Sequence, residues 1–350
     1  MKSNYRALSE LIEKVDERND DGAITELIGV SIDKCFIKSV ANTNGTDLSK
    51  YKIIRKNEFA VSLMQVSRDS KIPVARLEDY EVAIMSPAYP IFRVKDTRKI
   101  LPEYLDMWFK RPEFDREAAF IAVGGVRGSM PWEEFVKMKL PVPTIEKQLE
   151  IVNSYKAITE RIALKQKIND NLESMLTAVY FEQFYSSKAS EYTKLSDLMV
   201  FGNGKSRPKT NGTIPVYGGN GVLSYTDKYN AENTVLIGRV GAYCGSVYLE
   251  QSICWVSDNA IFAKSKITND EFFDYFLLKG LNLFNHHVGT GQQLLTQDIL
   301  NNIEVPKPDI DQIGMFNMKA KSVFETISAN KCEIIRLQKL SDLLLARLAS

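Results

Sequence analysis

The chain has 350 residues, of which 44% are hydrophobic and 25% are charged, and its net charge is +1. This composition excludes disordered and fibrous classes, and the length favours two or three compact units. The absence of a long apolar run or a signal-like start predicts a cytoplasmic protein with no membrane partner, and the near-neutral charge means that any contact with nucleic acid depends on local cations.

The chain repeats itself. The pattern Y-x-x-L-S-x-L begins at Tyr5 and begins again at Tyr192. A glycine-rich turn, a short amphipathic segment and Pro-x-Pro follow later in each half, as "GGVRGSMPWEEFVKMKLPVP" from Gly124 and "GTGQQLLTQDILNNIEVPKP" from Gly289. An internal repeat decides the architecture, so the sequence predicts two similar globular parts.

The elements between these marks come in the same order in both halves. Strand-like runs rich in branched and aromatic residues are "EFAVSLM" with "SPAYPIFRV" in the first half, and "NTVLIGRV" with "SDNAIFAK" in the second. Helical segments with aromatic residues at i, i+3, i+4 spacing follow, as "PEYLDMWFKRPEF" and "DEFFDYFLLKGLNLF". Each globular part is therefore predicted to mix strands with short helices.

After each Pro-x-Pro the sequence predicts a long helix of about 40 residues, on the order of 60 Å long, because Gly and Pro become rare and apolar residues recur at heptad spacing. Polar residues interrupt both seams, Lys165 with Asn169 in one and Asn330 in the other. Two matching seams favour pairing of the helices as a coiled coil, whereas packing of each helix on its own globular part is the alternative. The residues expected to pair the helices are Ile151, Ile158, Ile162, Leu172, Val179, Val323, Ile327, Ile334, Leu337 and Leu344.

Together these features resemble the DNA-specificity (S) subunits of type I restriction-modification systems. The repeated openings, the "GGVRG" and "GTGQQ" turns, the "LPVP" and "VPKP" stops and the two long helices carry the likeness over almost the whole chain. The resemblance implies an α+β fold with two pseudo-twofold-related target-recognition domains, separated by two long helices that form an antiparallel coiled coil. The expected boundaries are 1–144 for the first domain, 145–186 for the first helix, 187–309 for the second domain and 310–350 for the second helix.

The resemblance also implies a non-catalytic subunit. Each domain would read one half of a gapped, bipartite site in double-stranded DNA, and the helices would act as a spacer ruler and as the docking surface for two methyltransferase subunits. Restriction and translocation subunits would join the larger complex. The chain itself would hold no cofactor, because S-adenosylmethionine, ATP and Mg would be bound by the partner subunits.

Polar and basic residues on loops are the side chains that can enter a DNA groove or contact phosphates. Loops of this kind occur in both halves, although for any one residue a solvated surface loop is the competing interpretation. In the first half the candidates are Gln65, Ser67, Arg68, Lys71, Arg127 and Ser129. In the second half they are Lys205, Ser206, Arg207, Lys209, Tyr217, Asn220, Arg239, Tyr243, Gln292 and Gln293.

Enzymatic alternatives find little support. Gly204-Lys205-Ser206 lacks the first glycine of a phosphate-binding loop, since Met199 stands there, and Pro208 follows at once. His286 and His287 are adjacent and cannot chelate a metal as an i, i+4 pair would, and the four cysteines have no metal-ligand spacing. No Asn-Pro-Pro-Tyr or Asp-Pro-Pro-Tyr methyltransferase signature occurs. A protein-assembly scaffold that does not read DNA remains the second hypothesis.

Overall fold

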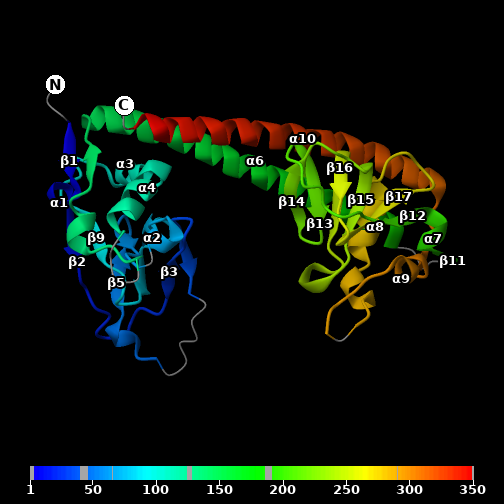
Figure 1. The fold of residues 1–350 in the computed structure, drawn as a ribbon, viewed down its shortest axis with the longest axis horizontal. Helices are drawn as coiled ribbons and strands as arrows, with labels where there is room; N and C mark the ends of the chain where they lie inside the picture. The colour runs from blue at the N-terminus through cyan, green and yellow to red at the C-terminus, as the bar shows by residue number, and fades with distance from the viewer. Residues whose placement is uncertain are drawn as a thin grey trace. The chain divides into compact units, whose positions relative to one another are not determined.

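The computed structural model describes residues 4–39, 46–64, 66–123, 128–185, 191–289 and 291–348. The chain divides into two compact units. The first comprises Met1–Leu164 with Glu333–Ser350, and the second comprises Lys165–Cys332. Each unit therefore contains one globular part and a stretch of each long helix (Figure 1).

The opening motif and the Pro-x-Pro stop of each unit pair with each other. Strand β1 (Tyr5–Ala7) runs antiparallel to β10 (Lys139–Pro141), with Tyr5 opposite Pro141. Strand β11 (Tyr192–Lys194) runs antiparallel to β18 (Glu304–Pro306) in the same register, with Tyr192 opposite Pro306. The repeated motifs are thus the two edges of one small sheet that closes each unit.

The first unit is built on a four-stranded antiparallel sheet of order β2-β9-β6-β7. Two separate hairpin-sized sheets, β3-β4 and β5-β8, accompany it. The strand bounds are β2 Ile12–Val15, β3 Ile28–Val30, β4 Phe36–Lys38, β5 Lys52–Arg55, β6 Phe59–Val61, β7 Val74–Arg76, β8 Val82–Met85 and β9 Ile91–Val94.

Short helices cover the sheet of the first unit. They are α1 Leu8–Leu11, α2 Val66–Asp69, α3 Pro102–Phe109, α4 Pro112–Ile121 and α5 Trp132–Phe135, whereas the 3-10 helix η1 Leu48–Lys50 has no buried residue. Helices α3 and α4 each begin with proline, whose fixed φ suits the first helical position. Phe59 and Phe92 of the sheet stack with ring centroids 5.2 Å apart, and Phe109 and Phe135 from α3 and α5 pack against them. This aromatic cluster forms the centre of the first core.

The second unit contains one six-stranded sheet of order β12-β17-β15-β16-β13-β14. All neighbours are antiparallel except β13 and β16, which are parallel. The bounds are β12 Met199–Asn203, β13 Ile214–Gly218, β14 Gly221–Thr226, β15 Ala231–Gly238, β16 Val247–Val256 and β17 Ala260–Ser265. The four strands that begin this order are connected as in the first unit, and the hairpin β13-β14 extends the sheet.

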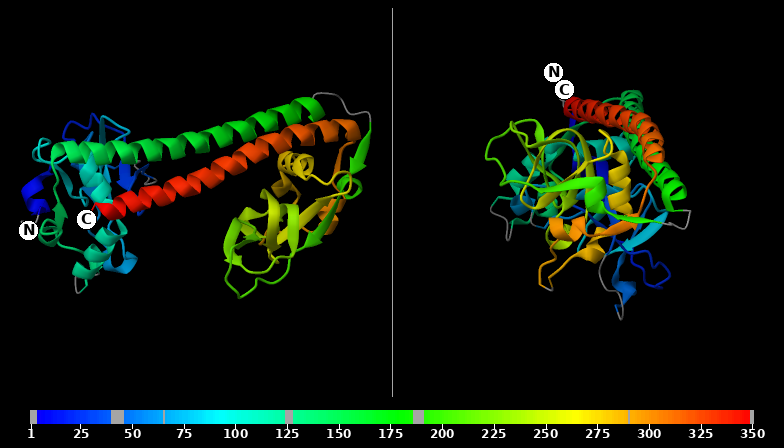
Figure 2. Two further views of the ribbon diagram at one scale, coloured as in Figure 1. Left: turned by 90° about the horizontal axis from the view of Figure 1, so that it is seen from above. Right: turned by 90° about the vertical axis from the view of Figure 1, so that its right-hand side faces the viewer.

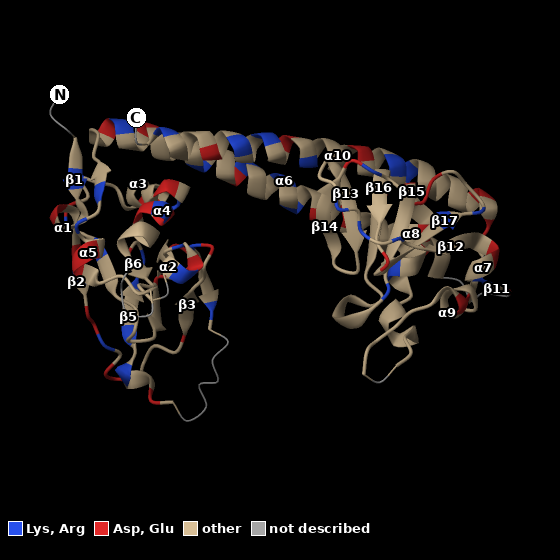
Figure 3. Cartoon of the chain, viewed as in Figure 1, with Lys and Arg blue, Asp and Glu red and all other residues tan. Residues whose placement is uncertain are grey.

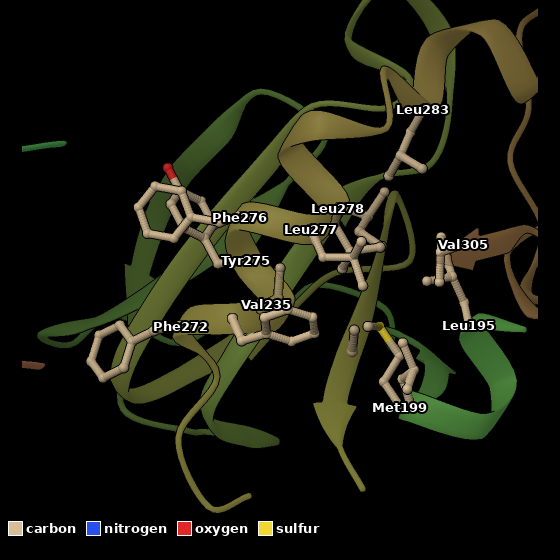
Figure 4. Packing of buried hydrophobic residues seen from close by; sticks show 14 of the residues in the cluster. Leu195, Met199, Val235, Phe272, Tyr275, Phe276, Leu277, Leu278, Leu283 and Val305 are labelled. Atoms are coloured by element: carbon tan, nitrogen blue, oxygen red, sulfur yellow. The ribbon is translucent and has the colours of Figure 1, made fainter. Parts of the chain in front are cut away.

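Helix α8 (Phe272–Gly280) contributes six residues to the second core, and every residue from Phe272 to Leu278 is buried. Figure 4 shows Phe272, Tyr275 and Phe276 of this helix near Val235 of the sheet, and Leu195 beside Val305 where the closing strands meet. The other short helices are α7 Leu195–Leu198, η3 Gly241–Tyr243, η4 Leu283–His286 and α9 Gln297–Asn301. Thr296 caps α9 by accepting a hydrogen bond from the Ile299 amide at 3.2 Å.

The two long helices, α6 (Ile145–Tyr185) and α10 (Ile310–Arg347), pair within each unit (Figures 1 and 2). In the first unit Arg161 forms an ion pair with Glu333, and in the second unit Gln183 donates to the carbonyl of Gln312 at 3.3 Å. Residue numbers rise along α6 as they fall along α10, so the pairing is antiparallel. The predicted α+β class and the antiparallel coiled coil are confirmed.

All ten residues expected to pair the helices are buried or half-buried. Ile327 and Ile334 are the most buried, at 4% and 8% exposure. The half-buried members are Ile151, Ile158, Ile162, Leu172, Val179, Val323, Leu337 and Leu344. The globular parts also contact the helices, since Val152, Leu345 and Leu348 join the first core and Leu176, Tyr180 and Phe316 join the second.

Candidate nucleic-acid interface

In the second unit, five loops are tied in a row by backbone hydrogen bonds at the ends of the sheet strands. They are the segment after β12, the β13–β14 turn, the β15–β16 connection, the β16–β17 turn and residues 288–289 with 291–295. The bonds run from Lys205 N to Val256 O, Ser257 N to Tyr217 O, Arg239 N to Asn259 O, Gly241 N to Gln293 O and Leu295 N to Arg239 O, all between 2.9 and 3.0 Å. Loops distant in sequence thereby form one continuous edge.

Glycine permits this close approach of backbones. A Cβ atom on Gly204 would lie 2.0 Å from the carbonyl oxygen of Ser257, and one on Gly238 would lie 2.1 Å from the carbonyl oxygen of Tyr243. A side chain at either position would push the neighbouring loop away. Gly204 and Gly238 are thus required by the packing of the loops themselves.

Most of the predicted residues of the second unit project from this edge into solvent. Gln293 and Arg239 are half-buried, and Tyr243 is 49% exposed. The remaining exposed residues are Lys205, Ser206, Arg207, Lys209, Asn220 and Gln292. The row therefore presents cations that can contact phosphates next to amide side chains that can contact base edges.

Two of the predicted residues, Tyr217 and Arg239, are half-buried. The Tyr217 hydroxyl donates to Glu250 at 3.0 Å, and burial followed by the Glu250 charge raises the pKa of Tyr217. Arg239 Nε is buried with no hydrogen-bond partner among the described residues. Tyr217 thus has its hydroxyl bonded within the sheet, whereas Arg239 retains an unused donor next to the loop row.

The predicted residues of the first unit that the structure describes lie around α2. Ser67 and Arg68 belong to this helix, and a Cβ on Gly128 would lie 2.4 Å from Ser67 Oγ, so the glycine turn that contains Ser129 lies against α2. Lys71 follows α2 and forms an ion pair with Asp33 at 3.6 Å. Gln65 and Arg127 lie outside the described residues.

A buried lysine that sequence reasoning missed stabilises this region. Lys34, in the β3–β4 turn, donates to the carbonyl of Phe109 and forms an ion pair with Asp115 at 2.8 Å. Asp115 also accepts from the amide of Ile72 at 3.0 Å, so one carboxylate joins the turn to the loop after α2. Burial lowers the pKa of Lys34, and the hydrogen bond and charge of Asp115 oppose that effect. A lone lysine in a turn gives no sequence signal for such a role.

The second unit contains a comparable residue, Asn230. Its side chain donates to Val256 O at 3.0 Å and accepts from Val256 N at 2.7 Å, which anchors the end of β16 beside the loop row. The indole of Trp255 donates to Lys205 O at 3.4 Å and holds the next loop. Neither residue has a motif that would have identified it from sequence.

The cations of the two units differ in their pairing. In the first unit Arg68 is paired with Asp69 at 2.9 Å, and Lys71 with Asp33. In the second unit, within the ranges that the structure describes, no acidic side chain lies within 4.0 Å of the charged groups of Lys205, Arg207 or Lys209. Figure 3 shows that, along both long helices, basic and acidic residues are interspersed. Three cations without an acidic partner among the described residues therefore lie close together in sequence on a loop of the second unit.

No group of three or more His, Cys, Asp or Glu residues that could hold a metal occurs in the described part of the chain. His287 Nδ1 lies beside the carbonyl of Phe284, and its ring packs 4.8 Å from the Phe284 ring. Within the described helices, none is both long and apolar enough to cross a membrane. The candidate interface thus consists of loop residues with cationic and amide side chains.

The second half of the chain matches a known family model. Residues 188–340 match the family model of the type I restriction modification DNA specificity domain. This range contains the entire row of tied loops in the second unit. No curated protein matches the sequence.

Three solved structures are similar to the chain. The S subunit of a type I restriction-modification system from M. genitalium has 16% identity and a TM-score of 0.63, with 100% of this chain and 97% of that chain covered. A chain from work on complex assembly and conformational transition of the type I R-M system has 17% identity, 98% and 96% coverage and a TM-score of 0.49. The HsdS subunit from Thermoanaerobacter tengcongensis has 16% identity, 99% and 96% coverage and a TM-score of 0.37.

At such low identity the first likeness establishes the fold, and the family match over residues 188–340 establishes the domain type. The resemblance drawn from the sequence is therefore confirmed, since residues 188–340 are similar to the type I restriction modification DNA specificity domain and the chain has the fold of a type I S subunit.

Proposed function

We propose that this chain reads DNA sequence for a type I restriction-modification complex, with each globular part contacting one half of a gapped, bipartite duplex site. The observation that carries the proposal is the row of tied loops in the second unit, which lies inside the residues matched by the specificity-domain family. Its unpaired cations suit phosphates, and Asn220, Gln292 and Gln293 suit base edges. The region around α2 would serve the first half-site.

The remaining parts of the complex follow from this assignment. The chain would be non-catalytic, and two methyltransferase subunits would dock on the paired helices and supply the chemistry. Restriction and translocase subunits would complete the assembly in the cytoplasm. S-adenosylmethionine, ATP and Mg would bind to those partners.

Methylation reports whether the chain reads DNA. When the chain is expressed with its methyltransferase, sequencing of modified adenines should reveal one gapped motif with an adenine in each half. Arg239→Ala should then weaken discrimination only in the half-site read by the second unit, by about 1–3 kcal/mol if the guanidinium contacts a base. Lys307→Ala, which removes an exposed cation next to the closing strand β18 of the same unit, is the matched control and should change neither half.

The outcomes separate the hypotheses. Modification of no gapped motif would contradict sequence reading and favour the assembly scaffold. Equal weakening of both half-sites by Arg239→Ala would make this residue a general phosphate contact.

The spacer role of the helices has its own test. Inserting seven residues into both helices, after Ile162 and after Ile334, keeps the heptad seams in phase. Because seven residues extend a helix by about 10 Å and a base-pair step is about 3.4 Å, the tolerated spacer should lengthen by about three base pairs. Full activity with an unchanged spacer would contradict the ruler.

A further inference from the structure

A buried polar layer interrupts the apolar seam between α6 and α10. Lys165 Nζ donates to Asn330 Oδ1 at 2.9 Å, and Asn330 Nδ2 donates to Asn169 Oδ1 at 2.9 Å. Asn169 is 9% exposed, and the other two residues are half-buried. All three belong to the second unit. One amide thus uses both its oxygen and its nitrogen to join two residues of the opposite helix.

The seam around this layer repeats itself. Ile158 and Leu172 lie one heptad before and after Lys165 on α6, and Val323 and Leu337 lie one heptad before and after Asn330 on α10. Aliphatic packing alone therefore allows the helices to slide by seven residues, since each knob would find a similar hole. Such a slip would place Lys165 opposite Val323 or Leu337 and leave its charge without the Asn330 oxygen.

Burying a polar group without its partner is unfavourable, whereas replacing a whole buried polar group by apolar residues is often neutral or stabilising. A gain in folding stability therefore does not explain why this seam has polar rather than apolar residues. Polar residues at a seam position are known to select one register of a coiled coil, because every other register leaves them unpaired.

The repeat strengthens this interpretation. Lys165 and Asn330 occupy equivalent positions in the two halves, since every member of the first heptad series lies 165 residues before a member of the second. In the polar layer, a residue of α6 therefore contacts the residue at the equivalent repeat position of α10. A slip in either direction breaks this correspondence.

We propose that Lys165, Asn169 and Asn330 are positioning residues that fix the axial register of α6 against α10. Through that register they would restrict the spacer between the two half-sites of DNA, and this second consequence rests on the proposed function. Leu176 and Tyr180 of α6 also pack in the second core and help to fix the position of this helix. The experiment must therefore separate the contribution of the polar layer to the register from the contribution of this packing.

Register can be measured without DNA. Spin labels at the exposed native Cys332 and at Gln166→Cys would report the distance between the helices in the full chain, after Cys35→Ser removes the other exposed thiol. The parent should show one distance population. Lys165→Leu with Asn169→Leu and Asn330→Leu should add a second population displaced along the helices by about 10 Å, the length of one heptad. The methylated sites should then include spacers changed by about three base pairs.

Two further variants guard against misfolding. Lys165→Asn with Asn330→Lys exchanges the polar partners and should retain a single distance population and the parent spacer. Lys167→Leu with Asn171→Leu and Lys331→Leu makes the same kinds of substitution at exposed helix positions and should also retain one register.

The results distinguish the two levels of the proposal. A single, unchanged distance in the triple leucine variant, or a slipped population in the exchanged variant, would overturn the register role. A slipped register with an unchanged DNA spacer would support the register role and contradict the ruler in the proposed function.

Discussion

In both units a strand from the opening motif pairs with the Pro-x-Pro strand, and a four-stranded antiparallel sheet follows with equivalent connections, β2-β9-β6-β7 and β12-β17-β15-β16. The units differ in what is added. The second extends its sheet with the hairpin β13-β14, whereas the first has two separate small sheets. The parts that close a unit and contact the helices are thus kept, while the loops proposed to contact DNA are rebuilt.

The equivalent helices α3 and α8 show the same divergence inside the cores. Asp106 of α3 is 4% exposed and is paired with Lys110 at 2.6 Å. Asp274 of α8 is 1% exposed, its carboxylate oxygens have no hydrogen-bond partner in the described structure, and the residue four positions later is the buried Leu278. A carboxyl kept in both copies is therefore paired with a lysine in one and lies beside another carboxyl, Glu271, in the other.

Core truncation gives the largest expected effect and tests whether the units are separate. Phe276→Ala should cost about 3–5 kcal/mol of unfolding free energy in the second unit, because the ring is 2% exposed and packs against Tyr180 and Phe316. Phe92→Ala is the counterpart in the first core. Hydrogen exchange should show lost protection only in the unit that carries the substitution. Equal loss in both units would mean that they unfold as one.

The unequal pairing of cations predicts unequal contributions to DNA affinity. Lys205→Ala with Arg207→Ala and Lys209→Ala should reduce the slope of log affinity against log salt by about three, if each cation contacts one phosphate. Arg68→Ala with Lys71→Ala should change the slope less, because these cations already form ion pairs with Asp69 and Asp33. Binding to a cognate duplex at several salt concentrations measures both. A larger effect of the first-unit pair would reverse the comparison.

The two buried carboxyls should respond to substitution with opposite signs. Burial, followed by the charge of Glu271, raises the pKa of Asp274 well above 3.8. The folded protein then binds more protons than the unfolded chain between these pKa values, so this carboxyl lowers the stability as the pH rises through that range. Asp274→Asn should remove the dependence and raise the unfolding free energy by about 1 kcal/mol at neutral pH.

Asp106→Asn should instead lower the unfolding free energy, by less than about 1 kcal/mol, since Lys110 is partly exposed and can be solvated. Urea denaturation of both variants from pH 4 to pH 8 would measure the two effects. Stabilisation by both substitutions would show that the ion pair in α3 contributes nothing.

Thiol labelling gives the smallest effect. Cys35 in the first unit is exposed and should react quickly in the folded protein, whereas Cys244 and Cys254 in the second are buried. Burial raises the pKa of Cys254 to about 12, which further slows its reaction. Reaction of Cys254 as fast as Cys35 would indicate frequent local opening of the six-stranded sheet.

Local sequence patterns predicted the internal repeat and the two long helices well. The openings, the Pro-x-Pro stops and the heptad seams are short-range signals, and they identified the repeat and both long helices. The pairing of Tyr5 with Pro141 was not predicted, because contacts between strands so far apart depend on the whole fold. The polar residues at 165, 169 and 330 were recognised as an interruption, but spacing did not show how their side chains bond.

The candidate interface was less predictable. Exposed loop cations could be recognised by residue type, whereas the bond from Tyr217 to Glu250 and the buried Nε of Arg239 follow from packing within the sheet. Lys34 and Asn230 stabilise loops through contacts with distant segments, and single residues of these types occur in many surface turns. Whether each predicted residue contacts DNA stays a prediction.

The closing strands have a consequence for how such a chain can change over generations. The backbone enters and leaves each unit at one small sheet, where Val142 N bonds to Asn4 O in the first unit and Lys307 N bonds to Glu191 O in the second. A gene segment that encodes everything between these strands can therefore be replaced by recombination with both ends still meeting at the same place. If each unit reads one half-site as proposed, exchange of such a segment would change the sequence preference and leave the helices unchanged.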